Sequence, residues 1–393
     1  MAFQPIAVTG IGAVTALGGN VNSLWSGLLA GQRPFGPVRA FDAQSCRVDL
    51  AAEVSVAVPN EGTCRTADLA IMSGREALAD SQRTVAADRI GLVVASTGMG
   101  DAALERALRE QPRDHDWWRQ CLKGTLADEL ATILELGEIR QVINTACSSG
   151  AIAIALACEG LDAGDYDMAL AIGCDELTKI TYSGFNSLRA LDPEPCKPFD
   201  IARRGMTIGE GSGCLVLERL ADARRKAKRI HALVVGAGWS CDASHLTAPD
   251  PGGKGAAIAI TKALAHANVL AGDVGFVNAH GTGTQLNDSA EISAIVKALG
   301  KHASSCKVHS VKASTGHCMG AAGTIEAIVA ILSLQQGVLP ATAGLRNCEF
   351  EGCVDCVKLD PRRLDKAFGI SNSFGFGGND ATLVFARSDS WAC

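Results

Sequence analysis

The sequence has few charged residues and no long uninterrupted hydrophobic run. Charged residues make up 20% of the 393 positions and hydrophobic residues 47%, which excludes a disordered or fibrous chain and favours a compact enzyme. The longest apolar stretches, such as residues 151–158, fall short of the roughly 18 residues that cross a bilayer. We therefore expect no membrane-spanning segment.

Signals for export and for binding to polyanions are also missing. The N-terminal residues 1–10 lack a basic region followed by an apolar region and a cleavage site, so we expect a cytoplasmic protein. The net charge of -6 gives no overall attraction to nucleic acid or to an anionic membrane. The basic run at residues 223–229 is the one local candidate, and a solvated helix face is the alternative interpretation.

Neither a metal site nor a nucleotide site is complete. Cys353 and Cys356 form a CxxC, but no second pair or nearby histidine supplies four ligands, and we interpret the fifteen cysteines as thiols in a reducing compartment. The glycines after His280 and at residues 10–19 lack the spacing and the lysine or acidic residue of nucleotide-binding loops. They allow close backbone approach instead, and we expect no cofactor.

Short β-branched runs alternate with Ala-rich segments of helical period, which predicts an α/β fold. The second half repeats the alternation of the first, so we expect two similar halves, residues 1–229 and 230–393. Residues 148–164 carry small side chains on every face and predict a helix buried between layers. The predicted strands are residues 6–12, 89–97, 141–147, 167–173, 213–220, 231–238, 272–280, 306–314, 368–373 and 380–388.

Cys147 stands where a predicted strand gives way to the Ala-rich helix. Unpaired backbone N–H groups at a helix N-terminus make that place electropositive. We therefore expect the thiolate, which attacks thioesters, to be favoured there, and the same amides to stabilise an oxyanion. The alternative is that Cys147 is a buried small hydrophobic residue like most free cysteines.

His280 and His317 occupy two similar places. Each follows a predicted strand and lies in a loop of Gly, Ser and Thr before a helix. An imidazole at such a strand end faces a cleft. For either histidine alone, a hydrogen-bonded structural role is the alternative.

Four motifs together resemble the β-ketoacyl synthases of fatty-acid and polyketide synthesis. They are NTACSSG at 144–150, NAHGTGTQLND at 278–288, VKASTGHCMGAAG at 311–323 and NSFGFGGND at 372–380. The resemblance covers nearly the whole chain. It implies the thiolase-like layered αβαβα architecture, with Cys147 accepting the acyl group and with His280 and His317 as the catalytic histidine pair.

The resemblance also assigns supporting residues. Lys312 and Glu326 match a charged network around the site, and Asp288 matches the acidic position of the first histidine loop. Phe376 matches a gate residue whose backbone N–H completes the oxyanion hole. The residues expected to contact substrate are Thr282, Thr284, Met99, Met206 and Phe374.

By this resemblance the chain is a 3-oxoacyl-[acyl carrier protein] synthase. It implies acyl carrier protein as partner, a homodimer or a heterodimer with a related synthase, no cofactor and no metal. A non-catalytic partner resembling a chain-length factor is the alternative, although such partners usually lack the cysteine. A thiolase would need a late catalytic cysteine, and Cys318 lies in the wrong motif.

Two regions depart from the family pattern. The segment at 113–124, with Trp117 and Trp118, lacks the usual proline-containing stretch, which leaves acyl chain length and pathway open. Few basic residues stand near the helix predicted around residue 70, so carrier-protein docking differs or uses other residues. Arg189 matches a docking position, and a surface salt bridge is an equal interpretation.

Overall fold

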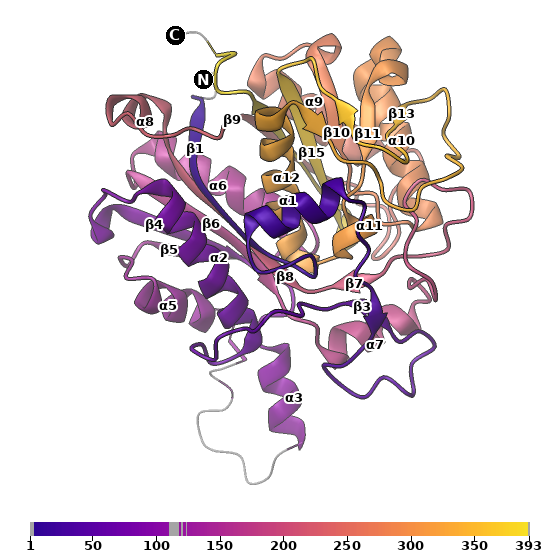
Figure 1. Ribbon diagram of the computed structural model, residues 1–393, viewed down its shortest axis with the longest axis horizontal. Coiled ribbons are helices and arrows are strands. Elements are labelled where there is room, and N and C mark those ends of the chain that lie inside the picture. Colours follow the sequence, from indigo (N-terminus) through magenta and orange to yellow (C-terminus); the bar gives the residue numbers. More distant parts are fainter. Residues whose placement is uncertain (1–3, 110–117, 119–120, 123, 392–393) are drawn as a thin grey trace.

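The computed structural model describes residues 4–109, 118, 121–122 and 124–391. Within these residues, eleven strands form one mixed sheet that runs across the molecule (Figure 1). In spatial order the strands are β13 (Asp355–Cys356), β11 (Lys307–His309), β10 (Val274–Asn278), β15 (Phe368–Gly375), β16 (Asn379–Ala386), β9 (Ala232–Cys241), β1 (Ile6–Val14), β8 (Gly211–Arg219), β6 (Met168–Asp175), β4 (Ile90–Ala95) and β5 (Arg140–Ile143).

Ten of the eleven strands form the same five-stranded unit twice, and β13 is an extra strand at the edge of the second half. If β13 is left out and the strands of each half are numbered along the chain, both halves have the spatial order third, second, fourth, fifth, first. The second strand pairs in parallel with the third and the fourth, and the fifth pairs antiparallel with the fourth and the first, in both halves. Strand β1 pairs with β9 and joins the two units. The prediction of two similar α/β halves is confirmed, while the boundary between residues 229 and 230 stays a prediction.

Helices lie in three layers around this sheet (Figure 1). Helices α2 (Arg65–Ser81) and α5 (Gly124–Ile133) cover the outer face of the first half, and α9 (Lys254–Ala267) and α10 (Gln285–Leu299) cover the outer face of the second. Between the halves lie α6 (Ser149–Ala163), packed on β4 and β6, and α12 (Ala322–Gln336), packed on β8 and β15. This arrangement is the expected αβαβα layering.

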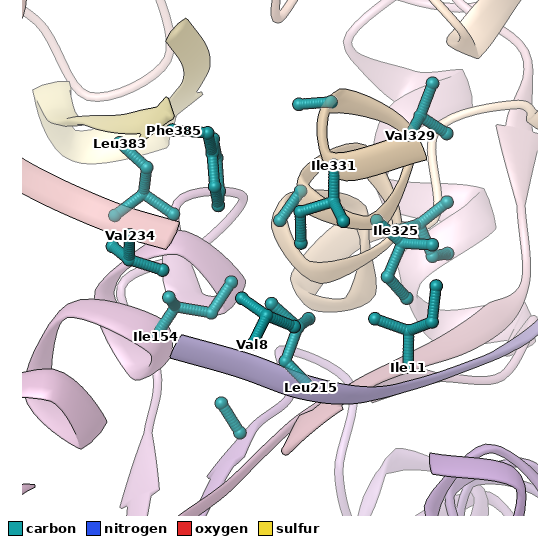
Figure 2. Packing of buried hydrophobic residues seen from close by; sticks show 14 of the residues in the cluster. Val8, Ile11, Ile154, Leu215, Val234, Ile325, Val329, Ile331, Leu383 and Phe385 are labelled. Atoms are coloured by element: carbon teal, nitrogen blue, oxygen red, sulfur yellow. The ribbon is translucent and has the colours of Figure 1, made fainter. Parts of the chain in front are cut away.

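The central helices form the core because they have almost no polar face. Every residue of α12 from Ala322 to Leu334 is buried, and small side chains on α6 allow the two helices to contact each other. Figure 2 shows Ile325 and Ile331 of α12 in the same apolar space as Val8 of β1. Both helices end at a glycine with positive φ, Gly164 and Gly337. Residues other than glycine adopt this conformation only at a cost in free energy.

Two apolar windows reach the length and mean hydropathy of a membrane span within the described residues. They are Ala146–Ala163 and Met319–Gln336, and 67% and 89% of their residues are buried inside the protein. The longest uninterrupted apolar stretches are shorter than these windows, because both windows include serine, glycine and acidic residues. Their burial marks them as core helices.

The remaining elements surround this frame. The basic run at residues 223–229 includes the end of a short helix, and its charges pair with neighbouring acids: Arg225 with Asp222, and Lys226 and Lys228 with Glu218. These pairs neutralise part of the run and disfavour a role in binding a polyanion, but only residues 223–225 lie on the predicted helix face, and Lys228 is buried against Glu218. The other helices are α1 (Val21–Leu29), α3 (Asp101–Arg109), α7 (Lys179–Ser187), α8 (Leu220–Arg225) and α11 (Lys312–Thr315), and the short strands are β2 (Gly36–Pro37), β3 (Leu50–Ala52), β7 (Ile208–Gly209), β12 (Val338–Leu339) and β14 (Arg362–Arg363).

Candidate active site

Cys147 lies in a tight turn between β5 and α6. Ala146 adopts the left-handed conformation with φ of 53°, and Ser148 is the N-cap of the helix that begins at Ser149. The Ser148 hydroxyl donates to the Thr145 carbonyl at 2.7 Å, and the Thr145 N–H donates to the Ser149 hydroxyl at 2.8 Å. These bonds fix the turn, and they hold the Cys147 side chain at 5% exposure.

Burial governs the ionisation of this thiol. It raises the pKa of Cys147 to about 12, with a further rise from Asp175, against the opposing effects of the Lys312 ammonium and of a hydrogen bond from the Phe376 backbone N–H. The expectation that the helix N-terminus favours the thiolate at rest is therefore wrong. Cys147 precedes the N-cap and is removed from water, so desolvation outweighs the helix amides.

The two histidines meet at one point. His280 follows β10, His317 follows α11, and their ring centroids lie 5.2 Å apart with the planes at 84°. The backbone of His317 is held on both sides, because its N–H donates to the Thr207 carbonyl at 2.7 Å and its carbonyl accepts from the Gly209 N–H at 3.0 Å. Residues that are 37 positions apart in the sequence therefore present their rings to the same space.

A buried lysine orients His280. The Lys312 ammonium donates to the His280 carbonyl at 2.6 Å and lies 3.2 Å from His280 Nδ1. It also forms an ion pair with Glu326, and both side chains are 1% exposed. Because an ammonium only donates, Nδ1 must accept, and the proton of the neutral ring sits on Nε2. The predicted contact of Lys312 with Glu326 is present.

Both imidazoles are neutral at ordinary pH. Burial holds the pKa of His280 well below 6.5, with further lowering by Lys312 and His317, and burial with Lys312 does the same for His317. Burial likewise raises the pKa of Glu326 to about 7, against the effect of Lys312. Each neutral ring offers one N–H donor, which suits stabilisation of a developing oxyanion.

One cavity brings the predicted residues together. Its volume is about 390 Å³, and Cys147, His280 and His317 all line it. Cys147 also lines a second cavity of about 310 Å³, and Phe376 and Phe185 line both cavities; their rings are 5.4 Å apart. Phe376 thus borders both spaces. The other predicted residues on the first cavity are Thr282, Thr284, Met206 and Phe374.

Two predicted residues lie elsewhere. Met99 follows β4 and packs in the outer apolar cluster of the first half with Leu126 and Leu130. Asp288 is buried on α10, where it accepts from the Phe199 N–H at 2.8 Å and the Gly283 N–H at 3.1 Å. It therefore shapes the loop that carries Thr282 and Thr284, one step removed from the histidines.

Two carboxylates that were not predicted from the sequence hold the backbone of the site. Glu291 accepts from the His280 N–H at 2.9 Å and the Gly281 N–H at 2.7 Å. Asp175 accepts from the Gly98 N–H at 2.9 Å and the Gly320 N–H at 2.6 Å, which ties β6 to the turn before α12. The signal for Glu291 was an acidic residue next to Ile292 on the apolar face of a helix.

The structure describes part of the regions that depart from the family pattern. Arg189 lines the main cavity, and its role in carrier-protein docking stays a prediction. Trp118 is exposed, whereas Trp117 lies outside the described residues. In the part of the chain that the structure describes, no group of three or more His, Cys, Asp or Glu side chains is arranged to hold a metal ion.

Comparison with known proteins agrees with this geometry. Residues 3–223 match the family model of the β-ketoacyl synthase N-terminal domain, and residues 231–346 match that of the C-terminal domain. The 3-oxoacyl-[acyl-carrier-protein] synthase 2 of Synechocystis sp. is 35% identical, covering 97% of this chain and 98% of that protein.

Solved structures give the same result. The ishigamide ketosynthase/chain length factor superposes with a TM-score of 0.91 at 30% identity, covering 98% of this chain and all of that one. A structure of a ketosynthase in complex with its chain length factor, from Xenorhabdus doucetiae, has a TM-score of 0.84 at 30% identity and covers 98% of both chains. Sequence motifs, fold and cavity agree with these similarities, and the chain belongs to the β-ketoacyl synthase family.

Proposed function

We propose that this protein is a 3-oxoacyl-[acyl carrier protein] synthase that condenses malonyl-[acyl carrier protein] with an acyl group held on Cys147. The observation that carries the proposal is the cavity on which one thiol and two neutral imidazoles meet. The curated relative from Synechocystis sp., similar over nearly the full chain, bears the same activity in its name.

The first half-reaction belongs to Cys147. Its sulfur attacks the thioester carbonyl of an acylated carrier protein, and the carrier thiol leaves, which gives ping-pong kinetics. Phe376 borders the cavity beside Cys147, and its backbone N–H supports the tetrahedral oxyanion. Because burial raises the pKa of this thiol, attack is coupled to loss of the proton as the substrate arrives.

The second half-reaction belongs to the histidines. The malonyl thioester carbonyl accepts N–H bonds from His280 and His317, and these bonds strengthen as carbon dioxide leaves and the enolate forms. Lys312 keeps the His280 proton on Nε2 and so aims it into the cavity. The enolate carbon then attacks the acyl-cysteine and releases the 3-oxoacyl thioester.

Acyl carrier protein is the proposed partner, and a dimer with a second copy or with a related synthase is the proposed assembly. The similar protein from Xenorhabdus doucetiae is a ketosynthase in complex with its chain length factor. A soluble protein fits the buried apolar helices, and we propose a cytoplasmic location. The non-catalytic alternative is less favoured because Cys147 and both histidines are present together.

Incubation with acyl-[acyl carrier protein], followed by mass spectrometry of the intact protein and its peptides, tests the proposal. We expect one acyl group on Cys147, and 3-oxoacyl product when malonyl-[acyl carrier protein] is added. A series of acyl chains of different length and saturation then identifies the preferred substrate. Absence of acylation with every chain tested, by protein that unfolds cooperatively, would favour the non-catalytic partner.

A further inference from the structure

A pair of thiols lies outside the active site, at strand β13 on the outer edge of the second half. Cys348 is partly exposed, Cys356 is buried, and both are free thiols. They line one surface cavity of about 290 Å³ together with Glu351 and Lys358. The two cysteines therefore border one opening to solvent.

The backbone on each side of this pair is fixed. Around Cys348, the Ile201 N–H donates to the Asn347 carbonyl at 2.9 Å, and the Glu349 N–H donates to the Phe199 carbonyl at 3.0 Å. These two hydrogen bonds fix the backbone of the segment that carries Cys348.

The segment that carries Cys356 is strand β13. Cys356 pairs with Val308 of β11 in a parallel ladder, and the Val357 N–H donates to the Val308 carbonyl at 2.8 Å. Cys348 packs against the buried apolar cluster that contains Cys356, and both residues line the same surface cavity. Two thiols that fixed segments hold in one cavity need little backbone movement to form a bond.

The two thiols differ in chemical state. Interaction with the neighbouring Cys356 thiol lowers the pKa of Cys348 to about 7, helped by the Phe350 backbone N–H and the Lys358 ammonium and opposed by burial and Glu351. The same interaction and burial raise the pKa of Cys356. Cys348 is therefore the nucleophile of the pair, and Cys356 remains a thiol.

We propose that Cys348 and Cys356 form a redox-active dithiol that a hydroperoxide converts into a disulfide. The Cys348 thiolate attacks one peroxide oxygen, the O–O bond breaks, and the leaving alkoxide or hydroxide takes up a proton. Cys348 is then a sulfenic acid. The Cys356 sulfur attacks the Cys348 sulfur, water leaves with the Cys356 proton, and two electrons have passed from the thiols to the peroxide.

A metal site is the competing use of these cysteines. Cys353 and Cys306 lie nearby in sequence or in the ladder, but the described residues contain no group of three such ligands with the arrangement that a metal needs. The dithiol is independent of the synthase reaction, since neither thiol lines the catalytic cavity.

Treatment of the reduced full-length protein with stoichiometric hydrogen peroxide tests this inference. We expect a mass about 2 Da lower, because two hydrogen atoms leave, and a cross-linked peptide pair containing Cys348 and Cys356. Reduction with dithiothreitol restores the mass. The matched control Cys353→Ser, in the same loop, forms the same cross-link, and so does Cys147→Ser.

Two variants separate the roles of the pair. Cys356→Ser stops at a sulfenic acid on Cys348 that dimedone traps, whereas Cys348→Ser forms neither the cross-link nor the adduct. Thermal unfolding shows that each variant is folded before it is scored. A first cross-link that joins Cys353 or Cys147, or equal thiol loss in wild type and Cys348→Ser, would overturn the assignment.

Discussion

The turn after the third strand differs between the two halves of the molecule, although the strands themselves repeat. In the first half, residues 144–148 lead directly from β5 to the buried helix α6 and present Cys147. In the second half, residues 310–321 lead from β11 to the buried helix α12 and present Lys312 and His317. The same arrangement of strands and helices thus places a thiol in the site from the first half and an imidazole from the second half.

The turn after the second strand also differs between the halves in the side chains that it carries. After β4, the Gly98 N–H is held by Asp175, and after β10 the N–H groups of His280 and Gly281 are held by Glu291. A buried carboxylate fastens both turns, but only the second turn carries an imidazole. The two halves therefore share one fold, and their different catalytic side chains lie in the turns where the halves differ.

Removal of the thiol has the largest expected effect. Cys147→Ala leaves no acceptor for the acyl group, so condensation falls roughly 10⁴-fold or more. The measurement is product formation from acyl- and malonyl-[acyl carrier protein]. Cys158→Ala, at a buried cysteine within α6, serves as the control and keeps near wild-type activity; equal losses in both variants would contradict a special role for Cys147.

Removal of either imidazole comes next. His280→Ala and His317→Ala each delete one N–H donor, and we expect carbon dioxide release from malonyl-[acyl carrier protein] to fall roughly a hundredfold to a thousandfold. His266→Gln, on the outer helix α9, is the control. A loss of less than about threefold in either alanine variant would show that the ring does not act as an oxyanion donor.

Lys312 links the second half's chemistry to its stability. Lys312→Met strands Glu326 without its cation in the core, and we expect a loss of about 3–5 kcal/mol in unfolding free energy. Because the folded-state pKa of Glu326 is raised, to about 7, the native state holds a proton that the unfolded state releases, and stability is lost as pH rises.

Urea unfolding of Lys312→Met below and above pH 7 measures this effect. The loss should be larger at the higher pH, and the double variant Lys312→Met with Glu326→Gln should recover part of it. The same loss at both pH values would mean that the defect comes from packing alone.

The smallest effect concerns the pH dependence of the two chemistries. Because burial raises the pKa of Cys147, its alkylation by iodoacetamide should accelerate about tenfold per pH unit between about pH 7 and 9, without a plateau. Because burial lowers the pKa of both histidines, decarboxylation should show no loss near pH 6.5 from imidazole protonation. A plateau in the alkylation rate near pH 7 would show instead that the helix N-terminus stabilises the Cys147 thiolate.

Sequence patterns identified what is local. Each of the ten predicted ranges contains a strand of the sheet, because β-branched runs between helical segments are a short-range signal. The range 306–314 was too long, since β11 ends at His309 and residues 312–314 belong to helix α11, and the two-residue strand β13 was not predicted. The motifs around Cys147, His280 and His317 lead to one cavity. Family resemblance, more than periodicity, supplied the roles of Lys312 and Glu326.

Features that depend on contacts between distant parts of the chain could not be predicted from the sequence. Glu291 and Asp175 act on backbone N–H groups of other elements, so their function depends on packing that no local pattern records. The direction of the Cys147 pKa depends on how completely the folded protein removes the thiol from water. Met99 follows the expected strand, yet its side chain belongs to the outer cluster, because the face that a residue takes after a strand depends on the turn.

A cross-test of the two half-reactions is the most direct test of the division between the halves. Malonyl-[acyl carrier protein] decarboxylation by Cys147→Ala should stay within about tenfold of wild type, because both N–H donors remain, while His280→Ala should still take an acyl group onto Cys147. If Cys147→Ala loses decarboxylation as completely as His280→Ala does, or if His280→Ala is not acylated, the thiol and the imidazoles do not divide the reaction in this way.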